Sequence, residues 1–459
     1  MTGGALVGLD VGSTMVKAAV FDSSGRLITW ASRSVPVIQL QPSWMERDVE
    51  ATWRAAAAVL RAVASRVRKV TAVGITGCGN GAVLVGFRGN VLRHGILSGD
   101  TRAADLVAIR RRSSYERPFP GQTACLVRWL EAHEPAVLKR ATALLFWKDF
   151  IRLRLTDKIC TDYTDAGASG LFDFKNLKWR ASHSFLPPVQ GSSAAAGVIT
   201  ATASERVGIP AGTPVFTGVI DCEAAALGSG VFDEGDLSVV AGTWSINQSY
   251  SRKPLKTVDL FLCNLSAHFG RWLLLEGGPG SSANFEWAVR TLQGRPDLGR
   301  ALRLAASTRR SNLLFVPGVA SGRGIFAGLD QSHCAGDLLR AVMEGVVYSH
   351  RVQIEKLAIA SSSFKRVRFA GGASRSTLWC QLFADGLGLP VEVPRGAELG
   401  ALGAALCAGV GVGRWSSLHE AQRATVRILR TFMPAADARE PTVRAYRRFK
   451  EISLNLSSS

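Results

Sequence analysis

The sequence predicts an α/β fold with two similar domains, and three observations support this prediction. The chain has 459 residues, of which 47% are hydrophobic, so it is long enough for two or three cores rather than one. Strand-like and helix-like segments are mixed near its N-terminus, which is typical of α/β proteins. A strand, a glycine bend and a returning strand occur once in each half, with Gly242 placed 230 residues after Gly12.

The first of these repeats begins at the N-terminus. An apolar run over residues 5–9 ends in Asp10, and a bend of one glycine and two hydroxyl residues follows at 12–14. Residues 15–21 alternate well enough to be the returning strand, and turn residues 22–25 lead into a third strand. The pattern therefore predicts an antiparallel meander whose first bend follows a carboxylate.

A helix and a further strand come next. Asp48 is placed to cap a helix whose apolar residues recur at 3.6-residue spacing up to Val67. Residues 70–76 are rich in β-branched side chains and predict a strand. Late in the chain, residues 337–359 form an amphipathic pattern that predicts a long helix.

The second repeat lies at mid-chain. Residues 237–241 and 246–250 are predicted strands on either side of a small-residue bend. Loop residues near 225–235 suggest the domain boundary, which gives an N-terminal domain of residues 1–228 and a C-terminal domain of residues 229–459.

The charge balance leaves several partners open. There are 55 basic and 36 acidic residues, a net charge of +19, which suits nucleic acid, lipid or a small anionic substrate. The basic residues are scattered, however, and the tightest runs are residues 110–112 and 447–448. Tyr446 and Phe449 are three residues apart, as expected for one packed face of a last helix. We expect no nucleic-acid partner; a nucleic-acid-binding protein remains a third alternative, which predicts salt-sensitive binding.

Cysteine usage and hydropathy point to a cytoplasmic protein. Eight cysteines occur, none in a Cys-x-x-Cys pair and none with a histidine cluster, so we expect reduced thiols and no zinc site. No signal-peptide pattern precedes the first strand. Residues 399–412 are apolar but too short for a membrane span, and they predict a small-residue helix inside the protein.

Two glycine patterns resemble a dinucleotide fingerprint, but their context excludes it. Residues 77–82 and 322–327 match G-x-G-x-x-[GA], a motif that requires a helix directly afterwards. The first match is followed by a strand, a turn and a strand, and the second by loop residues. No P-loop motif occurs either.

Asp10 is the first candidate site residue. A buried carboxylate is costly unless a metal or hydrogen bonds compensate for it, and a glycine bend with hydroxyl neighbours binds anions well. An acid that holds Mg²⁺ beside a phosphate-binding bend explains the pattern, with Lys17 adding positive charge and Gly242-Thr243 contributing from the other domain. The alternative is an exposed acid at a strand end.

Asp221 ends an apolar segment and precedes a small-residue helix. It fits two roles: a helix N-cap, or a general base that accepts the proton of a hydroxyl attacking the γ-phosphorus. A third signal follows the strand at 367–369, where Gly371 and Gly372 permit the close approach of a flat ligand such as adenine and ribose. The alternative there is a glycine turn needed only for packing.

The motifs GLDVGSTMVKAAVFD, GVIDCEAAALGSG, AGTWSIN and AGGASRSTLWCQLFADGLGLPVEVP, in this order, resemble the FGGY carbohydrate kinases. The resemblance implies two actin-like (ribonuclease H-like) domains with ATP and a sugar in the cleft between them. It implies that Asp10 helps to hold Mg²⁺ and that Asp221 is the catalytic base. The residues assigned to phosphate and nucleotide binding, Lys17 included, are Gly12, Ser13, Thr14, Lys17, Gly242, Thr243, Gly371, Gly372, Ala373 and Ser376.

The resemblance also suggests a substrate. The stretch at 44–48 is most similar to family members that phosphorylate L-xylulose, and next to those that phosphorylate erythritol. Gly79, Asn80 and Asp100 then occupy positions that contact the polyol, together with Asp221. One departure is Ser376, where relatives often have asparagine. A Lys-Asp pair at 148–149 is also usual in the family.

The expected function is therefore ATP- and Mg²⁺-dependent phosphorylation of a terminal hydroxyl on a small ketose or polyol, with a pentulose such as L-xylulose first. The alternative from another class is an actin-like ATPase or ligand sensor without sugar phosphotransfer. The expected partners are the sugar or polyol and ATP, with no nucleic acid and no membrane; a homodimer remains open.

Overall fold

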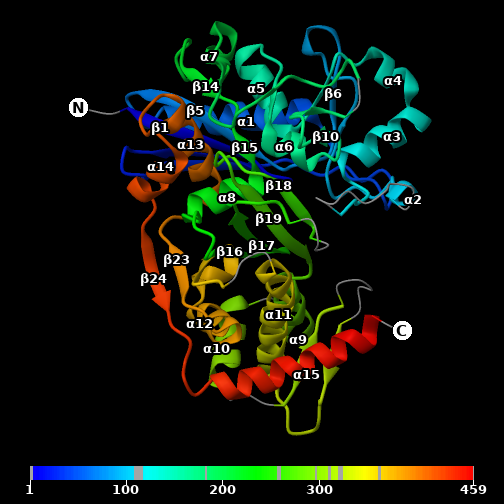
Figure 1. Cartoon of the computed structure of the whole chain (residues 1–459), viewed down its shortest axis with the longest axis vertical. Coiled ribbons are helices and arrows are strands. Elements are labelled where there is room, and N and C mark those ends of the chain that lie inside the picture. The colour runs from blue at the N-terminus through cyan, green and yellow to red at the C-terminus, as the bar shows by residue number, and fades with distance from the viewer. Residues whose placement is uncertain are drawn as a thin grey trace. The chain divides into compact units, whose positions relative to one another are not determined.

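The computed structural model describes residues 4–107, 117–180, 183–255, 260–294, 297–308, 312–318, 324–359 and 363–457 (Figure 1). The arginine run at 110–112 and part of the second glycine match, Gly322 and Arg323, lie outside these residues.

The chain forms two compact units, each assembled from three segments. Unit 1 consists of Met1–Gly230, Arg252–Leu273 and Gly396–Val426. Unit 2 consists of Val231–Ser251, Leu274–Arg395 and Arg427–Ser459. The division into domains of residues 1–228 and 229–459, which was expected from the sequence, stays a prediction.

The sheet of unit 1 is built around the N-terminal meander. β1 (Ala5–Val11) and β2 (Met15–Phe21) are antiparallel, with Asp10 opposite Lys17, and they confirm the predicted strands to within one residue. β5 (Val70–Gly77) lies parallel to β1 on its other side. The sheet runs in the order β13-β14-β5-β1-β2-β3, with β15 also paired to β5. Its other strands are β3 (Leu27–Ser34), β13 (Ala195–Val198), β14 (Pro214–Phe216) and β15 (Val219–Ile220).

One face of this sheet packs on the predicted N-terminal helix. The helix α1 (Val49–Ala64) begins after Asp48, whose carboxylate accepts the Ala51 N–H at 3.0 Å, so the predicted N-cap is confirmed. Val7, Leu9 and Val11 join the core that α1 contributes to, because alternate residues of a strand point to one face. Two further helices lie near α1, namely α5 (Trp147–Thr156) and α7 (Ala201–Val207).

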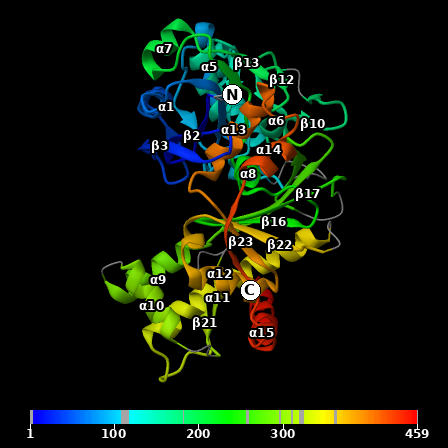
Figure 2. The same ribbon diagram turned by 90° about the vertical axis from the view of Figure 1, so that its left-hand side faces the viewer.

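The other face packs on two helices of small residues, α8 (Asp221–Ser229) and α13 (Leu399–Gly411), which contact one another along their length (Figure 2). A Cβ added at Gly8 would lie 1.8 Å from the carbonyl oxygen of Ala401, and only glycine permits this approach. The prediction of a buried small-residue helix is confirmed by α13. In the described part of the chain, every helix is either too short or too polar to span a lipid bilayer.

The first glycine match leads from β5 into β6 (Val83–Val85) and not into a helix, which confirms the exclusion of a dinucleotide fingerprint. The remaining elements of unit 1 are β4 (Glu46–Arg47), β7 (Gly95–Ile96), α2 (Ala104–Val107), α3 (Thr123–His133), α4 (Pro135–Arg140), β8 (Ala143–Leu145), β9 (Thr161–Asp162), α6 (Tyr163–Ala168), β10 (Phe172–Asp173), β11 (Lys178–Trp179), β12 (Val189–Gln190), β18 (Leu262–Leu265) and α14 (Leu418–Thr425).

The sheet of unit 2 repeats this strand pattern. β16 (Asp236–Ala241) and β17 (Trp244–Ser251) are antiparallel around a glycine bend, and β22 (Arg366–Ala370) lies parallel to β16. β1, β2 and β5 pair in the same way in unit 1, which confirms the predicted internal repeat. The sheet continues through β19 (Trp272–Pro279) at one side and β23 (Val391–Pro394) and β24 (Ile428–Phe432) at the other.

Helices and a small hairpin complete unit 2. The long helix predicted at 337–359 is α11 (Ala335–Ala358). Tyr446 and Phe449 of α15 (Arg439–Ser457) are buried against Tyr348, which confirms the predicted packed face. The other elements are α9 (Ala283–Gln293), α10 (Leu298–Ser307), α12 (Thr377–Leu387), β20 (Leu314–Val316) and β21 (Ile325–Ala327).

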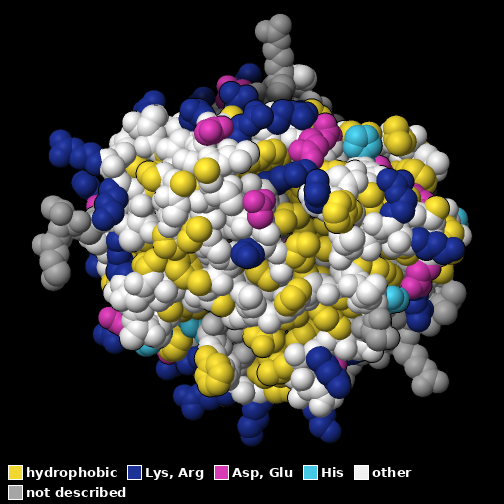
Figure 3. All heavy atoms as spheres, turned by 90° about the horizontal axis from the view of Figure 1, so that it is seen from above, with side chains coloured by type: hydrophobic (Ala, Val, Ile, Leu, Met, Phe, Trp, Pro, Cys, Tyr) yellow, Lys and Arg dark blue, Asp and Glu magenta, His cyan; other side chains and the backbone are white. Residues whose placement is uncertain are grey.

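The distribution of basic side chains and the state of the cysteines match what the sequence predicts. On the face in Figure 3, lysine and arginine side chains are spread among apolar and uncharged ones rather than gathered in one patch. All eight cysteines are free thiols, and only Cys334 among them is exposed.

Candidate active site

Asp10 and Asp221 belong to one site on the α8/α13 face of unit 1. Asp10 lies near the end of β1, and a Cβ added at Gly400 in α13 would approach its Oδ2 to 2.9 Å. Burial, and then the charge of Asp221, raise the pKa of Asp10 to about 7, while Lys17 opposes the shift. A buried carboxylate whose pKa is raised by a second carboxylate indicates a site where a cation or a proton is held.

Asp221 is the first residue of α8 and not its N-cap, which is Ile220. Its Oδ1 accepts the N–H of Cys222 at 2.7 Å. Burial raises the pKa of Asp221 to about 6, although hydrogen bonds from the backbone of Cys222 and Gly79 work against the shift. The N-cap interpretation of Asp221 is therefore wrong, and its carboxylate is poised near neutral pH.

Lys17 forms an ion pair that the sequence analysis did not anticipate. Its Nζ lies 3.1 Å from Oε2 of Glu398, the residue just before α13. Glu398 also contributes to the raised pKa of Asp10. No local pattern marks this glutamate, because it reaches the N-terminal site only when the 396–426 segment folds into unit 1.

The bend after β1 presents its hydroxyl residues to solvent. Ser13 and Thr14 are exposed, and Gly12 is partly buried. The guanidinium of Arg47 donates through Nη1 to the carbonyl oxygens of Gly12 at 2.7 Å and Ser13 at 3.0 Å. Arg47 lies within the 44–48 stretch, and no local sequence pattern predicts this role.

The Gly79–Asn80 loop lies beside Asp221. A Cβ added at Gly79 would lie 2.2 Å from Cδ1 of Ile220 and 3.4 Å from Oδ1 of Asp165, so only glycine fits. Asn80 is buried at φ 60°, and its Oδ1 accepts the N–H of Thr123 at 3.2 Å. Its Nδ2 donates to no acceptor in the described part of the chain, which leaves both N–H groups of the side-chain amide for a ligand.

Asp100 has a structural role in the protein. Its buried carboxylate accepts the N–H of Met45 at 2.6 Å and two guanidinium N–H groups of Arg102 at 2.9 and 2.8 Å. Arg102 in turn stacks on Trp44 and pairs with Glu46. Substrate contact by Asp100 stays a prediction, and it would add to these bonds.

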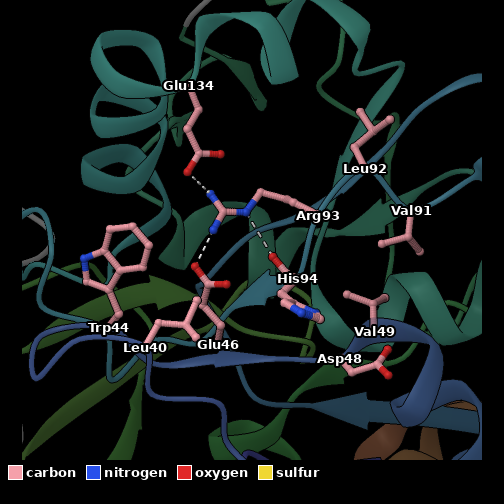
Figure 4. A pocket seen from close by; sticks show the side chains of 10 residues that line it. All are labelled: Leu40, Trp44, Glu46, Asp48, Val49, Val91, Leu92, Arg93, His94 and Glu134. Carbon is pink, nitrogen blue, oxygen red and sulfur yellow. Dashed lines mark hydrogen bonds and ion pairs between the residues drawn. The ribbon is translucent and has the colours of Figure 1, made fainter.

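A pocket of about 490 Å³ lies next to this network, and Asp10, Asp221 and Gly79 are not among its lining residues. Figure 4 shows the guanidinium of Arg93 between the carboxylates of Glu46 and Glu134, with its Nη1 2.7 Å from Glu134. These pairs fix β4, because Glu46 is half of that strand.

A fully buried ion cluster supports the start of α8. Lys148 lies 2.6, 3.0 and 3.1 Å from the carboxylates of Asp149, Asp162 and Asp165. Burial lowers the pKa of Lys148, but the three carboxylates outweigh this effect and raise it. Burial raises the pKa of Asp165 well above its usual value. The hydroxyl of Thr164 donates to Asp162 at 2.6 Å and accepts the N–H of Ile220 at 2.9 Å. The cluster thus holds the residue before Asp221.

Two cysteines flank the carboxylates. Burial raises the pKa of Cys78 to about 12 and that of Cys222 well above its usual range. Both thiols are therefore neutral at physiological pH, as expected for small packing residues rather than redox groups.

In unit 2 the two predicted nucleotide motifs come together at the ends of β16 and β22. Gly371 has φ 89°, and a Cβ there would lie 2.8 Å from the carbonyl oxygen of Ala241, directly before Gly242. The Ser282 hydroxyl donates to the Gly242 carbonyl at 3.0 Å. Ser376 caps α12, accepting the N–H of Trp379 at 3.4 Å, so its hydroxyl already has a role in the protein.

The residues around Asp10 fit a magnesium ion. Its Oδ1 is buried without a hydrogen-bond partner in the described part of the chain, and carboxylate oxygen is a ligand that Mg²⁺ prefers. No group of three or more His, Cys, Asp or Glu side chains that could hold a metal occurs among the described residues. A magnesium ion here would therefore depend on water and substrate phosphates for its other ligands.

A glycine bend beside buried carboxylates suits phosphoryl transfer to an alcohol. Comparisons with known proteins identify the family of the chain. Models of the N-terminal and C-terminal domains of the FGGY family of carbohydrate kinases match residues 5–228 and 237–412. The chain belongs to this family and is a carbohydrate kinase, and the actin-like α/β fold implied by the resemblance is confirmed.

Several relatives cover nearly the whole chain. A probable L-xylulose kinase of Pasteurella multocida is 31% identical over 448 residues, 91% of this chain and 92% of that protein. An L-xylulose/3-keto-L-gulonate kinase of Escherichia coli is 29% identical over 97% of this chain and 96% of its own. The crystal structure of xylulose kinase from Rhodospirillum rubrum has a TM-score of 0.90 at 25% identity and covers 99% of both chains.

Proposed function

We propose that this kinase transfers the γ-phosphoryl group of ATP to a terminal hydroxyl of a small ketose or polyol. A pentulose such as L-xylulose is the first choice, with a tetritol or hexulose next. Relatives named as L-xylulose and xylulose kinases, matched over most of the chain, support this choice. The observation that carries the proposal is the pair Asp10 and Asp221, which belong to one site and both have raised pKa values.

Asp221 is the proposed general base. A carboxylate with a pKa of about 6 is ionised at neutral pH yet is a better proton acceptor than an ordinary aspartate. It lies beside the Gly79–Asn80 loop, where the free amide donor of Asn80 suits a sugar hydroxyl. Asp221 therefore accepts the proton of the hydroxyl that attacks phosphorus, and the bonds at Ile220 and Cys222 keep its carboxylate in place.

Asp10 and the bend form the proposed phosphate side of the site in unit 1. When bound, Mg²⁺ would neutralise charge on the phosphates, and Asp10 is the residue that would hold it. Ser13 and Thr14 offer exposed hydroxyls and backbone N–H groups to a phosphate. Lys17, held by Glu398, adds positive charge beside Asp10.

The nucleotide residues proposed in unit 2 are Gly242, Thr243, Gly371, Gly372 and Ala373. Gly242 and Gly371 meet at the ends of neighbouring strands, where bare backbone lets a flat ligand and phosphates come close. Ser376 also caps α12, where its hydroxyl oxygen accepts an N–H, so it would contact the nucleotide through its O–H donor or its remaining lone pair.

The test is an ADP-release assay with purified protein, Mg-ATP and a panel of pentuloses, pentitols, erythritol and hexuloses. We expect ADP release that depends on a pentulose, with L-xylulose among the best substrates. Release that requires only another sugar class would overturn the pentulose choice. Release that is equal with and without every sugar would instead support an ATPase without phosphotransfer.

A further inference from the structure

Arg47 is a buried cation without an acidic partner. Its side chain has no exposed surface, and no carboxylate in the described part of the chain lies within ion-pair distance of it. Its Nε and Nη2 atoms also have no hydrogen-bond partner among the described residues. Besides the two carbonyls, the ring of Trp147 lies 4.2 Å from the guanidinium carbon. Burying an unpaired charge is costly, so an anion bound nearby would stabilise this arrangement.

The strand β4 explains why this arginine stays in place. Neighbouring residues of a strand point to opposite faces, so Glu46 faces the arginines 93 and 102 while Arg47 faces the bend after β1. Glu46 is therefore neutralised on its own side, as Figure 4 shows for Arg93, and leaves the charge of Arg47 uncompensated.

The two bonds that Arg47 donates determine the direction of the bend's N–H groups. In a trans peptide the carbonyl and the following N–H point in opposite directions. Holding the Gly12 and Ser13 carbonyls therefore turns the N–H groups of Ser13 and Thr14 away from Arg47. Neither N–H donates to an acceptor in the described part of the chain, and both residues are exposed. Free N–H groups on successive residues of a bend can bind an anion.

We propose that Arg47 is a positioning residue for the terminal phosphate of the nucleotide. It fixes the Gly12–Thr14 bend with two N–H donors outward, and its charge acts on the phosphate through the two peptide units it holds. The inference rests on the proposed function, which places the γ-phosphate at this bend. It adds a residue that acts on the nucleotide without touching it.

The test compares Arg47→Met, Arg47→Lys and the control Arg414→Met. Arg414 is a matched control because it too donates to a backbone carbonyl of unit 1, that of Gly4 at 2.6 Å, and lies over a tryptophan. Calorimetry measures binding of Mg-ADP and of a non-hydrolysable Mg-ATP analogue. Hydrogen exchange measures the peptide that covers the bend in nucleotide-free protein.

We expect Arg47→Met to weaken the ATP analogue about tenfold or more and ADP less than about threefold, because only the former carries the terminal phosphate. The bend peptide should exchange faster, and Arg47→Lys should recover part of the analogue affinity. Arg414→Met should leave both affinities and the exchange of the bend unchanged.

If Arg47→Met bound the ATP analogue with wild-type affinity, the inference would be overturned while the proposed function would stand. Equal loss of both ligands, without recovery in Arg47→Lys, would also overturn it, because Arg47 would then be needed only for folding. Wild-type protein that binds neither nucleotide would overturn the proposed function, and the inference with it.

Discussion

At the scale of single residues, the site depends on carboxylates held where ionisation is unfavourable. Asp221 keeps its position through the N–H of Cys222 and through the Thr164 bond to the preceding residue. Asp10 has an oxygen beside the bend that finds no hydrogen-bond partner among the described residues. Under the proposed function, the proton acceptor Asp221 and the cation ligand Asp10 are therefore two different carboxylates of unit 1.

The substitution Asp221→Asn tests the proton acceptor. It keeps the shape of the side chain but removes the negative charge that accepts the hydroxyl proton, so turnover should fall roughly 10²–10⁴-fold. The affinity for ADP, measured by calorimetry, should stay nearly unchanged. Turnover equal to that of the wild type would remove Asp221 from the mechanism.

The pH profile gives a second test of the same group. Because burial raises the pKa of Asp221 to about 6, the base becomes protonated as the pH falls through that value. The ratio kcat/KM for the sugar, measured at constant Mg-ATP, should fall about tenfold per pH unit below about pH 6. Asp221→Asn should show a shallower decline, because Asp10, whose pKa is about 7, is then the remaining site carboxylate that titrates in this range, and a wild-type profile that is flat down to about pH 4 would contradict the assignment.

At the scale of elements, the close contact of α13 with β1 and β5 determines the core of unit 1. Gly8 and Gly74 contact carbonyls of α13 that leave no room for a Cβ. Such contacts let helix and sheet approach closely, but they make the interface sensitive to a single added methyl group.

The substitution Gly8→Ala should destabilise the protein by about 1–3 kcal/mol, because the new Cβ would meet the Ala401 carbonyl oxygen. The measurement is the midpoint of thermal unfolding. Gly191→Ala is the matched control, since a Cβ there meets nothing within 4 Å, and its midpoint should equal that of the wild type. Equal midpoints for both variants would show that the interface relaxes at no cost.

Elements with a strong local pattern were predictable from the sequence, and contacts made over long chain separations were not. Alternation and turn residues locate β1, β2 and the Asp48 cap, because neighbouring residues alone determine them. Glu398 and Arg47 reach the site from distant segments, and no local pattern reveals their partners. Asp100 was predicted to contact the polyol, which stays a prediction, and its additional bonds to Arg102 appear only in three dimensions.

At the scale of the whole molecule, unit 1 needs a segment from near the C-terminus. Residues 396–426 supply α13 and α14 to it. A fragment of residues 1–228 would therefore leave one face of β1 and β5 uncovered. The fragment should show no cooperative thermal transition by circular dichroism.

The control for this prediction joins residues 396–426 to the fragment through a Gly/Ser linker, and cooperative unfolding should return at least in part. Cooperative unfolding of residues 1–228 alone would contradict the prediction and favour an autonomous N-terminal domain.

The late origin of α13 also affects how the protein is made in the cell. The ribosome synthesises the first two strands at the start of translation, yet the helix that covers them is complete only after residue 411. For most of synthesis, the nascent chain therefore exposes an apolar surface that attracts chaperones or aggregates. Slowed translation upstream of this helix should lower the yield of folded enzyme more than slowing placed after it.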